Sequence, residues 1–168
     1  MDYYLEIWMR DFPKDLLKGI RIKNIEQYHP HITLVRPFNI LTSEADIMSR
    51  IAEFCKGREP IPFAIEGSER FDNQDGIYYY FPVVDAEKLL KFNNGLEGAL
   101  DSYVHFAGKL NEEKIFHVTV KTDLDIPPCP KTKFYMDRLT AMRKMGNDND
   151  IIWFSYDFVA QRLLSREE

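Results

Sequence analysis

The sequence predicts an α+β fold in which antiparallel strands pair with their neighbours and helices pack on one side of the sheet. Three observations predict it. Short runs of alternating apolar and polar residues recur along the chain and are typical of strands. Two longer stretches, 43–55 and 85–103, show helical periodicity. Strand-like runs mostly follow one another without a crossover helix, which favours hairpins over parallel units.

In the first third of the chain, two strands and one helix are expected. Tyr3–Met9 alternates large apolar and polar residues, and His31–Phe38 is β-branched and bounded by prolines. The helix begins after Ser43, a good N-cap, and ends before Gly57. The apolar residues of this segment fall on one helical face: Ile47, Met48, Ile51, Phe54 and Cys55.

The middle of the chain predicts a strand pair followed by the second helix. Strands are expected at 61–66 and 76–84, with a turn at 73–76 between them. The helix is expected at 85–103 with Asp85 as its N-cap.

The last third predicts one more strand and a final hairpin. The strand is expected at 116–121, and a proline-rich linker follows at 127–130. The hairpin is expected to pair 134–143 with 151–161 across a polar tip.

Composition restricts the class of protein. A chain of 168 residues, with 45% hydrophobic and 29% charged residues, suits one soluble domain or two small lobes. A net charge of −5 disfavours coating of long duplexes, although a local patch for one phosphate is compatible with it. Two cysteines cannot form a disulfide framework, and neither a signal peptide nor a membrane span is recognisable. We therefore expect a cytoplasmic protein with no membrane partner.

A short repeat is the most informative feature of the sequence. His31-Ile32-Thr33-Leu34 recurs as His117-Val118-Thr119-Val120, which lies 117 − 31 = 86 positions later. Side chains alternate along a strand, so the histidine and the threonine of each motif project from the same face. If the two strands face one another, two His–Thr pairs converge on one cleft.

Such a set of side chains suits phosphoester chemistry without a metal. Imidazole has a reference pKa of about 6.5, so one ring can accept a proton while the other donates one near neutral pH. The threonine hydroxyls can donate hydrogen bonds to phosphate oxygens.

The two motifs and the order of elements resemble the two-histidine (2H) phosphoesterase superfamily, which includes 2′-5′ RNA ligases and cyclic phosphodiesterases. The resemblance covers most of the chain and implies one bilobal, pseudo-twofold domain over 1–168, with two antiparallel sheets facing across a central cleft. It implies that His31 and His117 are catalytic and that Thr33 and Thr119 bind phosphate. One departure is Phe116, where members of the family often have proline.

The function that this resemblance implies is metal-independent hydrolysis of cyclic phosphodiesters, at 2′,3′-cyclic phosphate RNA ends or on small nucleotides. Alternatives are 2′-5′ RNA ligation by the reverse transesterification, a non-catalytic module that binds RNA ends or nucleotides, and a metal-dependent hydrolase. The expected partner is a nucleotide or RNA terminus that carries a phosphate. No cofactor is expected, and a monomer is favoured.

Further candidates surround the two motifs. Lys121 shares the strand face of His117. Arg36 follows the first motif and lies on the opposite strand face from His31. Both are candidates to place positive charge near a phosphate, against the alternative of solvated strand ends. His29 and His31 could chelate a metal with Asp123 or Asp125, although His29 is more typical of a rim residue.

Aromatic residues raise a choice between core packing and base stacking. Tyr78 and Tyr80 alternate with Tyr79 and Phe81, so one of these two faces must belong to the core. The other face, together with Phe71 or Tyr28, is a candidate surface for a nucleobase. His105 has no partner pattern around it and is expected to be structural or exposed.

Overall fold

A computed structural model gives the fold of residues 2–9, 12–17, 29–74, 76–108, 114–120, 125–146 and 150–165. The helical segments are the short 3-10 helix η1 and the helices α1 and α2, with these bounds: η1 (Lys14–Leu17), α1 (Glu44–Cys55) and α2 (Glu87–Leu100). The strands are β1 (Tyr3–Trp8), β2 (His31–Ile40), β3 (Ile61–Gly67), β4 (Glu69–Asn73), β5 (Gly76–Val84), β6 (Val104–Phe106), β7 (His117–Val120), β8 (Cys129–Met136), β9 (Arg138–Arg143), β10 (Ile151–Asp157) and β11 (Arg162–Leu164).

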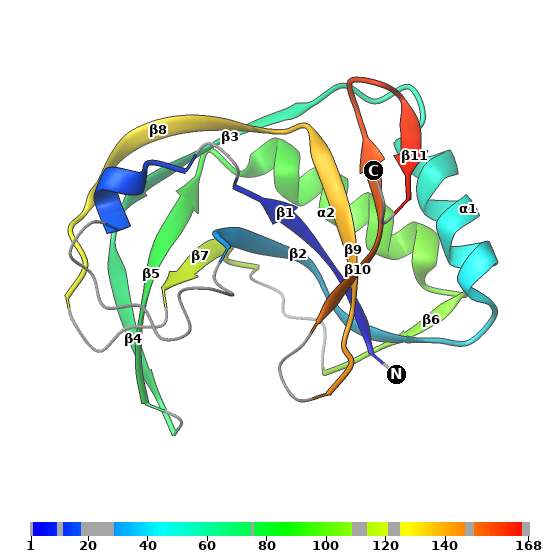
Figure 1. Cartoon of the computed structure of the whole chain (residues 1–168), viewed down its shortest axis with the longest axis horizontal. Helices are drawn as coiled ribbons and strands as arrows, with labels where there is room; N and C mark the ends of the chain where they lie inside the picture. Colours follow the sequence, from blue (N-terminus) through cyan, green and yellow to red (C-terminus); the bar gives the residue numbers. More distant parts are fainter. Residues whose placement is uncertain are drawn as a thin grey trace.

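The strands form one strongly curved sheet in the order β11-β10-β9-β1-β2-β7-β5-β3-β8. In addition, β4 pairs with β5 and β6 pairs with β2, and every recorded pairing is antiparallel. Figure 1 shows the sheet as an arch that is open on one side. The α+β class with antiparallel strands is therefore confirmed.

The two halves of the arch meet where β2 pairs with β7. The recorded register there is a single pair, Ile32 opposite Val118. One half consists of β11-β10-β9-β1-β2 and the other of β7-β5-β3-β8, so the two expected sheets are joined edge to edge. The junction brings the strands of the two repeated motifs side by side.

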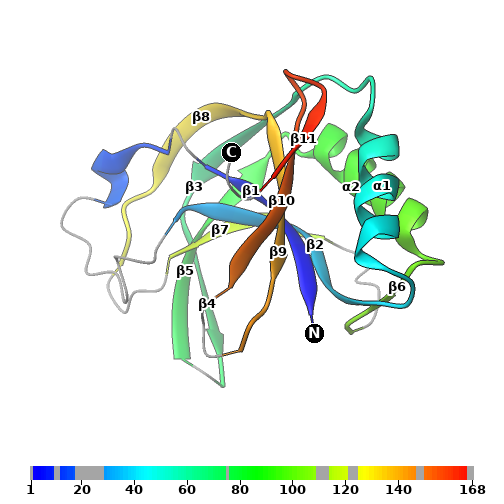
Figure 2. The ribbon, with the colours of Figure 1, turned by 45° about the vertical axis from the view of Figure 1, so that its right-hand side comes forward.

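Both helices lie together on the outer side of the sheet, as expected (Figure 2). Their apolar faces are buried against the strands, with Ile47 and Ile51 of α1 and Leu89 and Leu96 of α2 fully excluded from solvent. The inward residues of β2 and β7 belong to the same core: Ile32, Leu34, Val118 and Val120. The core therefore occupies the side of these strands opposite the His–Thr face. Within the described residues, no helix is long and apolar enough to cross a bilayer.

The caps of the two helices differ in how well the sequence predicted them. Ser43 caps α1 as expected, because its hydroxyl accepts a hydrogen bond from the backbone N–H of Asp46 at 3.1 Å. The prediction for Asp85 is wrong: Ala86 is the N-cap of α2 and no side chain caps this helix. Asp85 instead has a φ of 53°, in the left-handed region that ends β5 in a turn.

Two predicted hairpins needed correction. The turn at 73–76 joins β5 to β4, a strand that the sequence reasoning missed, while β3 pairs with the far end of β5. The predicted strand 134–143 is divided at Asp137 into β8, which pairs with β3, and β9, which pairs with β1 and β10. A single predicted strand thus supplies strands to both halves of the sheet. Similarly, the predicted strand 151–161 ends at Asp157 in a turn that leads to β11.

Candidate active site

The two motifs form what we call the His–Thr square: His31 and Thr33 on β2, and His117 and Thr119 on β7. Because Ile32 lies opposite Val118 in an antiparallel pair, His31 lies opposite Thr119 and Thr33 lies opposite His117. Ile32 and Val118 are fully buried on the core side. The four side chains of the square therefore project together from the other face of the sheet.

Strand geometry gives the dimensions of the square. Residues directly opposite in an antiparallel pair have Cβ atoms about 4.5–5.5 Å apart, and diagonal neighbours are about 7–8 Å apart. The two histidines occupy one diagonal of the square and the two threonines the other. One phosphate group placed over the centre is thus within reach of both rings and both hydroxyls.

Both histidine rings are held in the same way by their own strands. Nδ1 of His31 lies 2.9 Å from the carbonyl oxygen of His29, and Nδ1 of His117 lies 3.1 Å from that of Ile115. A carbonyl oxygen only accepts hydrogen bonds, so in each ring Nδ1 carries the hydrogen and donates it. Nε2 is then the atom that each ring offers for proton transfer.

A buried carboxylate next to His31 is the main feature that the sequence reasoning missed. Glu6 is fully buried on β1, opposite Thr33, and its Oε2 lies 3.6 Å from Nε2 of His31. Its Oε1 accepts hydrogen bonds from Trp8 Nε1 at 2.5 Å and from His29 Nε2 at 2.9 Å. The sequence places Glu6 on the polar face of an alternating strand. Its neighbours on that face, Tyr4 and Trp8, are only partly buried, so the complete burial of Glu6 is evident only from the folded structure.

The surroundings of His117 are aromatic. Tyr80 lies opposite Thr119 on the neighbouring strand β5, and its ring centroid is 5.1 Å from that of His117. The Tyr80 hydroxyl donates to Glu69 Oε2 at 2.5 Å, and this hydrogen bond raises the pKa of Tyr80 above its usual value. Phe71 on β4 lies against the Tyr80 ring and is 38% exposed. One side of the site therefore has an accessible aromatic surface.

The structure also decides which face of the tyrosine run is core. Tyr79 and Phe81 are buried, whereas Tyr78 and Tyr80 are on the face of His117. Tyr79 donates a hydrogen bond to Asp125, which raises its pKa.

The structure places only some of the other residues that the sequence suggested for the site. Arg36 donates to the carbonyl oxygens of Ala107 and Gly108 at 3.2 and 3.0 Å and lies over the Phe106 ring at 4.8 Å. None of these contacts involves the His–Thr square. Tyr28, Lys121 and Asp123 lie outside the described residues. His105 is exposed on β6, as expected.

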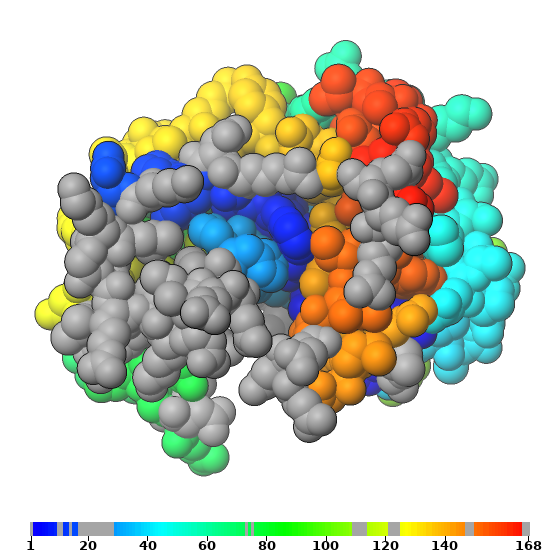
Figure 3. Space-filling model, viewed as in Figure 1, coloured from blue at the N-terminus to red at the C-terminus, as the bar shows by residue number. Residues whose placement is uncertain are grey.

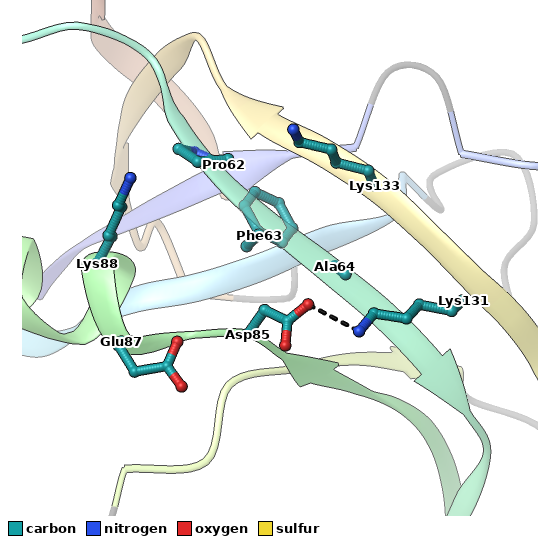
Figure 4. Close-up of a pocket in the computed structure, with 8 residues that line it drawn as sticks. All are labelled: Pro62, Phe63, Ala64, Asp85, Glu87, Lys88, Lys131 and Lys133. Atoms are coloured by element: carbon teal, nitrogen blue, oxygen red, sulfur yellow. Dashed lines mark ion pairs between the residues drawn. The ribbon is translucent and has the colours of Figure 1, made fainter.

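The strands that carry the square, β2 and β7, lie at the middle of the sheet. In the space-filling view, the surfaces of β1 and β2 are recessed beside the projecting surface of β9 and β10 (Figure 3). A separate cavity of about 520 Å³ lies between β3, β8 and the start of α2 (Figure 4). Its lining contains an ion pair of 2.9 Å between Lys131 and Asp85 but no residue of the square. The repeated motifs, rather than this cavity, therefore define the candidate active site.

Comparison with known proteins identifies the family of this chain. Residues 11–142 match the family model of the 2'-5' RNA ligase superfamily. The match covers well over half of the chain, which therefore belongs to this superfamily, that of the 2H phosphoesterases. No curated relative matches the chain.

Solved structures show the same fold. The protein TT0787 of Thermus thermophilus aligns with a TM-score of 0.65 and 12% identity, over 98% of this chain and 97% of that one. E. coli LigT complexed with 3'-AMP aligns with a TM-score of 0.55 and 13% identity, over 92% and 96% of the two chains. E. coli LigT complexed with NADP+ gives 0.54 and 12%, over 92% and 95%.

Proposed function

We propose that the protein is a metal-independent phosphoesterase that hydrolyses cyclic phosphodiesters, either 2′,3′-cyclic phosphates at RNA ends or cyclic phosphates of small nucleotides. The observation that carries the proposal is the register of β2 and β7, which sets each histidine opposite the threonine of the other motif. Membership of the 2'-5' RNA ligase superfamily supports an enzyme of this general kind.

The proposed reaction uses the two Nε2 atoms on opposite sides of one phosphate. One neutral imidazole takes a proton from water as the water oxygen bonds to phosphorus. The other imidazole, protonated, gives its proton to the ribose oxygen as the phosphorus–oxygen bond of the ring breaks. Thr33 and Thr119 donate hydrogen bonds to the two non-bridging oxygens, where negative charge accumulates in the transition state. The proton taken up and the proton released balance over one turnover.

The aromatic surface beside His117 supports a nucleotide as the substrate. Tyr80 lies beside His117 and the partly exposed Phe71 lies against Tyr80, and stacking on aromatic rings tolerates any base. Structures of E. coli LigT complexed with 3'-AMP, NADP+ and ATP show that a protein of this fold accommodates nucleotides. The protein has a net charge of −5, but it can still bind such a substrate because it has to hold only one phosphate group.

The test is an assay of nucleoside 2′,3′-cyclic phosphates in the presence of EDTA. Turnover with a bell-shaped pH profile is expected, and His31→Ala and His117→Ala should each lower kcat by about 10²–10⁴-fold, the usual contribution of a general acid or base. His105→Ala, an exposed histidine on β6, is the matched control and should be unchanged.

Two outcomes would contradict the proposal. Nucleotide binding that survives both substitutions, with no turnover in the unsubstituted protein, would indicate a binding module. Joining of RNA ends under the same conditions, without hydrolysis, would assign the reverse transesterification, in which a ribose hydroxyl attacks in place of water.

A further inference from the structure

Three potential metal ligands lie together at one corner of the His–Thr square. Glu6, His29 and His31 each offer one ligand atom, and these atoms all lie within 4.8 Å of one another. The separations from the carboxylate are 2.9 Å for His29 Nε2 to Oε1 and 3.6 Å for His31 Nε2 to Oε2. Ligands around a tetrahedral ion with bonds of about 2.0–2.1 Å lie about 3.3–3.4 Å apart, so only small shifts are needed for these atoms to share an ion.

The carboxylate of Glu6 lacks a full set of partners. Glu6 is fully buried, and its Oε2 has no hydrogen-bond partner within the described part of the chain. A buried carboxylate oxygen without a partner is costly, and coordination of a cation is one of the few ways to compensate it. The unpartnered atom is also the one directed toward Nε2 of His31.

The groups behind the ligands suit a metal site as well. Metal-bound histidine typically donates its other ring N–H to a carbonyl or carboxylate, and His31 Nδ1 already donates to the His29 carbonyl oxygen. Ligating carboxylates are usually held by a further hydrogen bond, which Trp8 Nε1 supplies to Oε1 of Glu6. Both ligands are thus oriented before any ion arrives.

We propose that Glu6, His29 and His31 form a binding site for a divalent transition-metal ion of the zinc class. Two imidazole nitrogens and one carboxylate oxygen are ligands that zinc prefers, and three protein ligands leave one coordination position open. Inhibition by the metal follows if the proposed function is correct. An ion coordinated by Nε2 of His31 blocks proton transfer at that atom and therefore inhibits the metal-independent reaction. The site would make the enzyme sensitive to free zinc.

Binding is tested on the full-length protein after treatment with EDTA and removal of the chelator. Titration with Zn²⁺ by calorimetry should show one ion per chain, and Co²⁺ should give visible absorption bands that Zn²⁺ abolishes. His29→Gln and Glu6→Gln should each weaken Zn²⁺ binding at least about tenfold. His105→Gln, which changes an exposed histidine on another strand, is the matched control. Because Glu6 is buried, its variant is checked by circular dichroism, and half-buried His29 carries the test if Glu6→Gln does not fold.

Inhibition is measured separately from binding. Zn²⁺ should abolish turnover of a cyclic phosphate, EDTA should restore it, and the inhibitory concentration should rise in His29→Gln by the same factor as the dissociation constant. The site is disproved if Zn²⁺ and Co²⁺ do not bind, or bind equally well to both variants. Turnover that zinc leaves unchanged or increases, with binding intact, disproves inhibition alone. The binding measurement needs no substrate, so its result stands whether or not the proposed hydrolysis is observed.

Discussion

Each histidine of the square lies opposite a threonine that comes from the other half of the sheet. The two rings are held alike through Nδ1, yet their surroundings differ. His31 has the buried Glu6 carboxylate beside it, whereas His117 has the Tyr80 ring. Equivalent motifs thus place two histidines in unlike surroundings.

The threonines give a prediction at this scale. Thr33→Val and Thr119→Val preserve side-chain shape but remove the hydroxyl donor. Each should lower kcat for a cyclic phosphate by about 10²–10³-fold, the usual effect of losing one donor to developing negative charge. Thr33→Ser and Thr119→Ser retain the hydroxyl and should keep most of the activity. Equal losses in the valine and serine variants would show that the hydroxyls have no such role.

At the scale of elements, helix α2 connects the two strands of the square. Asn93 of α2 donates to the carbonyl oxygen of Leu34 on β2 at 2.6 Å. Lys114, just before β7, donates to Asn93 at 2.5 Å and to Glu97 of α2. Asn93 and Glu97 are buried, so this network is shielded from water. It fixes β2 and the entry to β7 against one helix.

Removing Lys114 should therefore be costly. Lys114→Met leaves the carboxylate of Glu97 buried and unpaired, and the free energy of unfolding should fall by about 3–5 kcal/mol. The double variant Lys114→Met with Glu97→Leu removes both charges and should recover most of this loss. Urea denaturation of the three proteins measures the difference. A double variant no more stable than the single one would contradict the assigned pairing.

Elements that depend on local signals could be predicted from the sequence. Helix α1 begins where Ser43 indicates, because capping involves only neighbouring residues. The faces of β2 and β7 follow from alternation alone. The role of Glu6 could not be predicted, because its burial depends on pairing between β1 and β2. The division of 134–143 at Asp137 likewise depends on which distant strand each part meets.

At the scale of the whole molecule, the two cysteines report on the integrity of the core. Cys55 and Cys129 are buried, and burial raises the pKa of Cys55 to about 12 and that of Cys129 above its usual value. A raised pKa means that the reactive thiolate is scarce at pH 8. Both thiols should therefore resist a thiol reagent such as DTNB in the native protein, and two per chain should react in denaturant. Rapid labelling without denaturant would show that the core opens locally.

The junction of β2 with β7 also determines when the site can form while the chain is being synthesised. Ile32 and Val118 are 118 − 32 = 86 positions apart, and β1 pairs with β9, where Tyr3 meets Arg143. Contacts between such distant residues close large loops and form slowly compared with local ones. A nascent chain carries His31 and Thr33 long before β7 has been made. The complete square can therefore form only after most of the protein has left the ribosome.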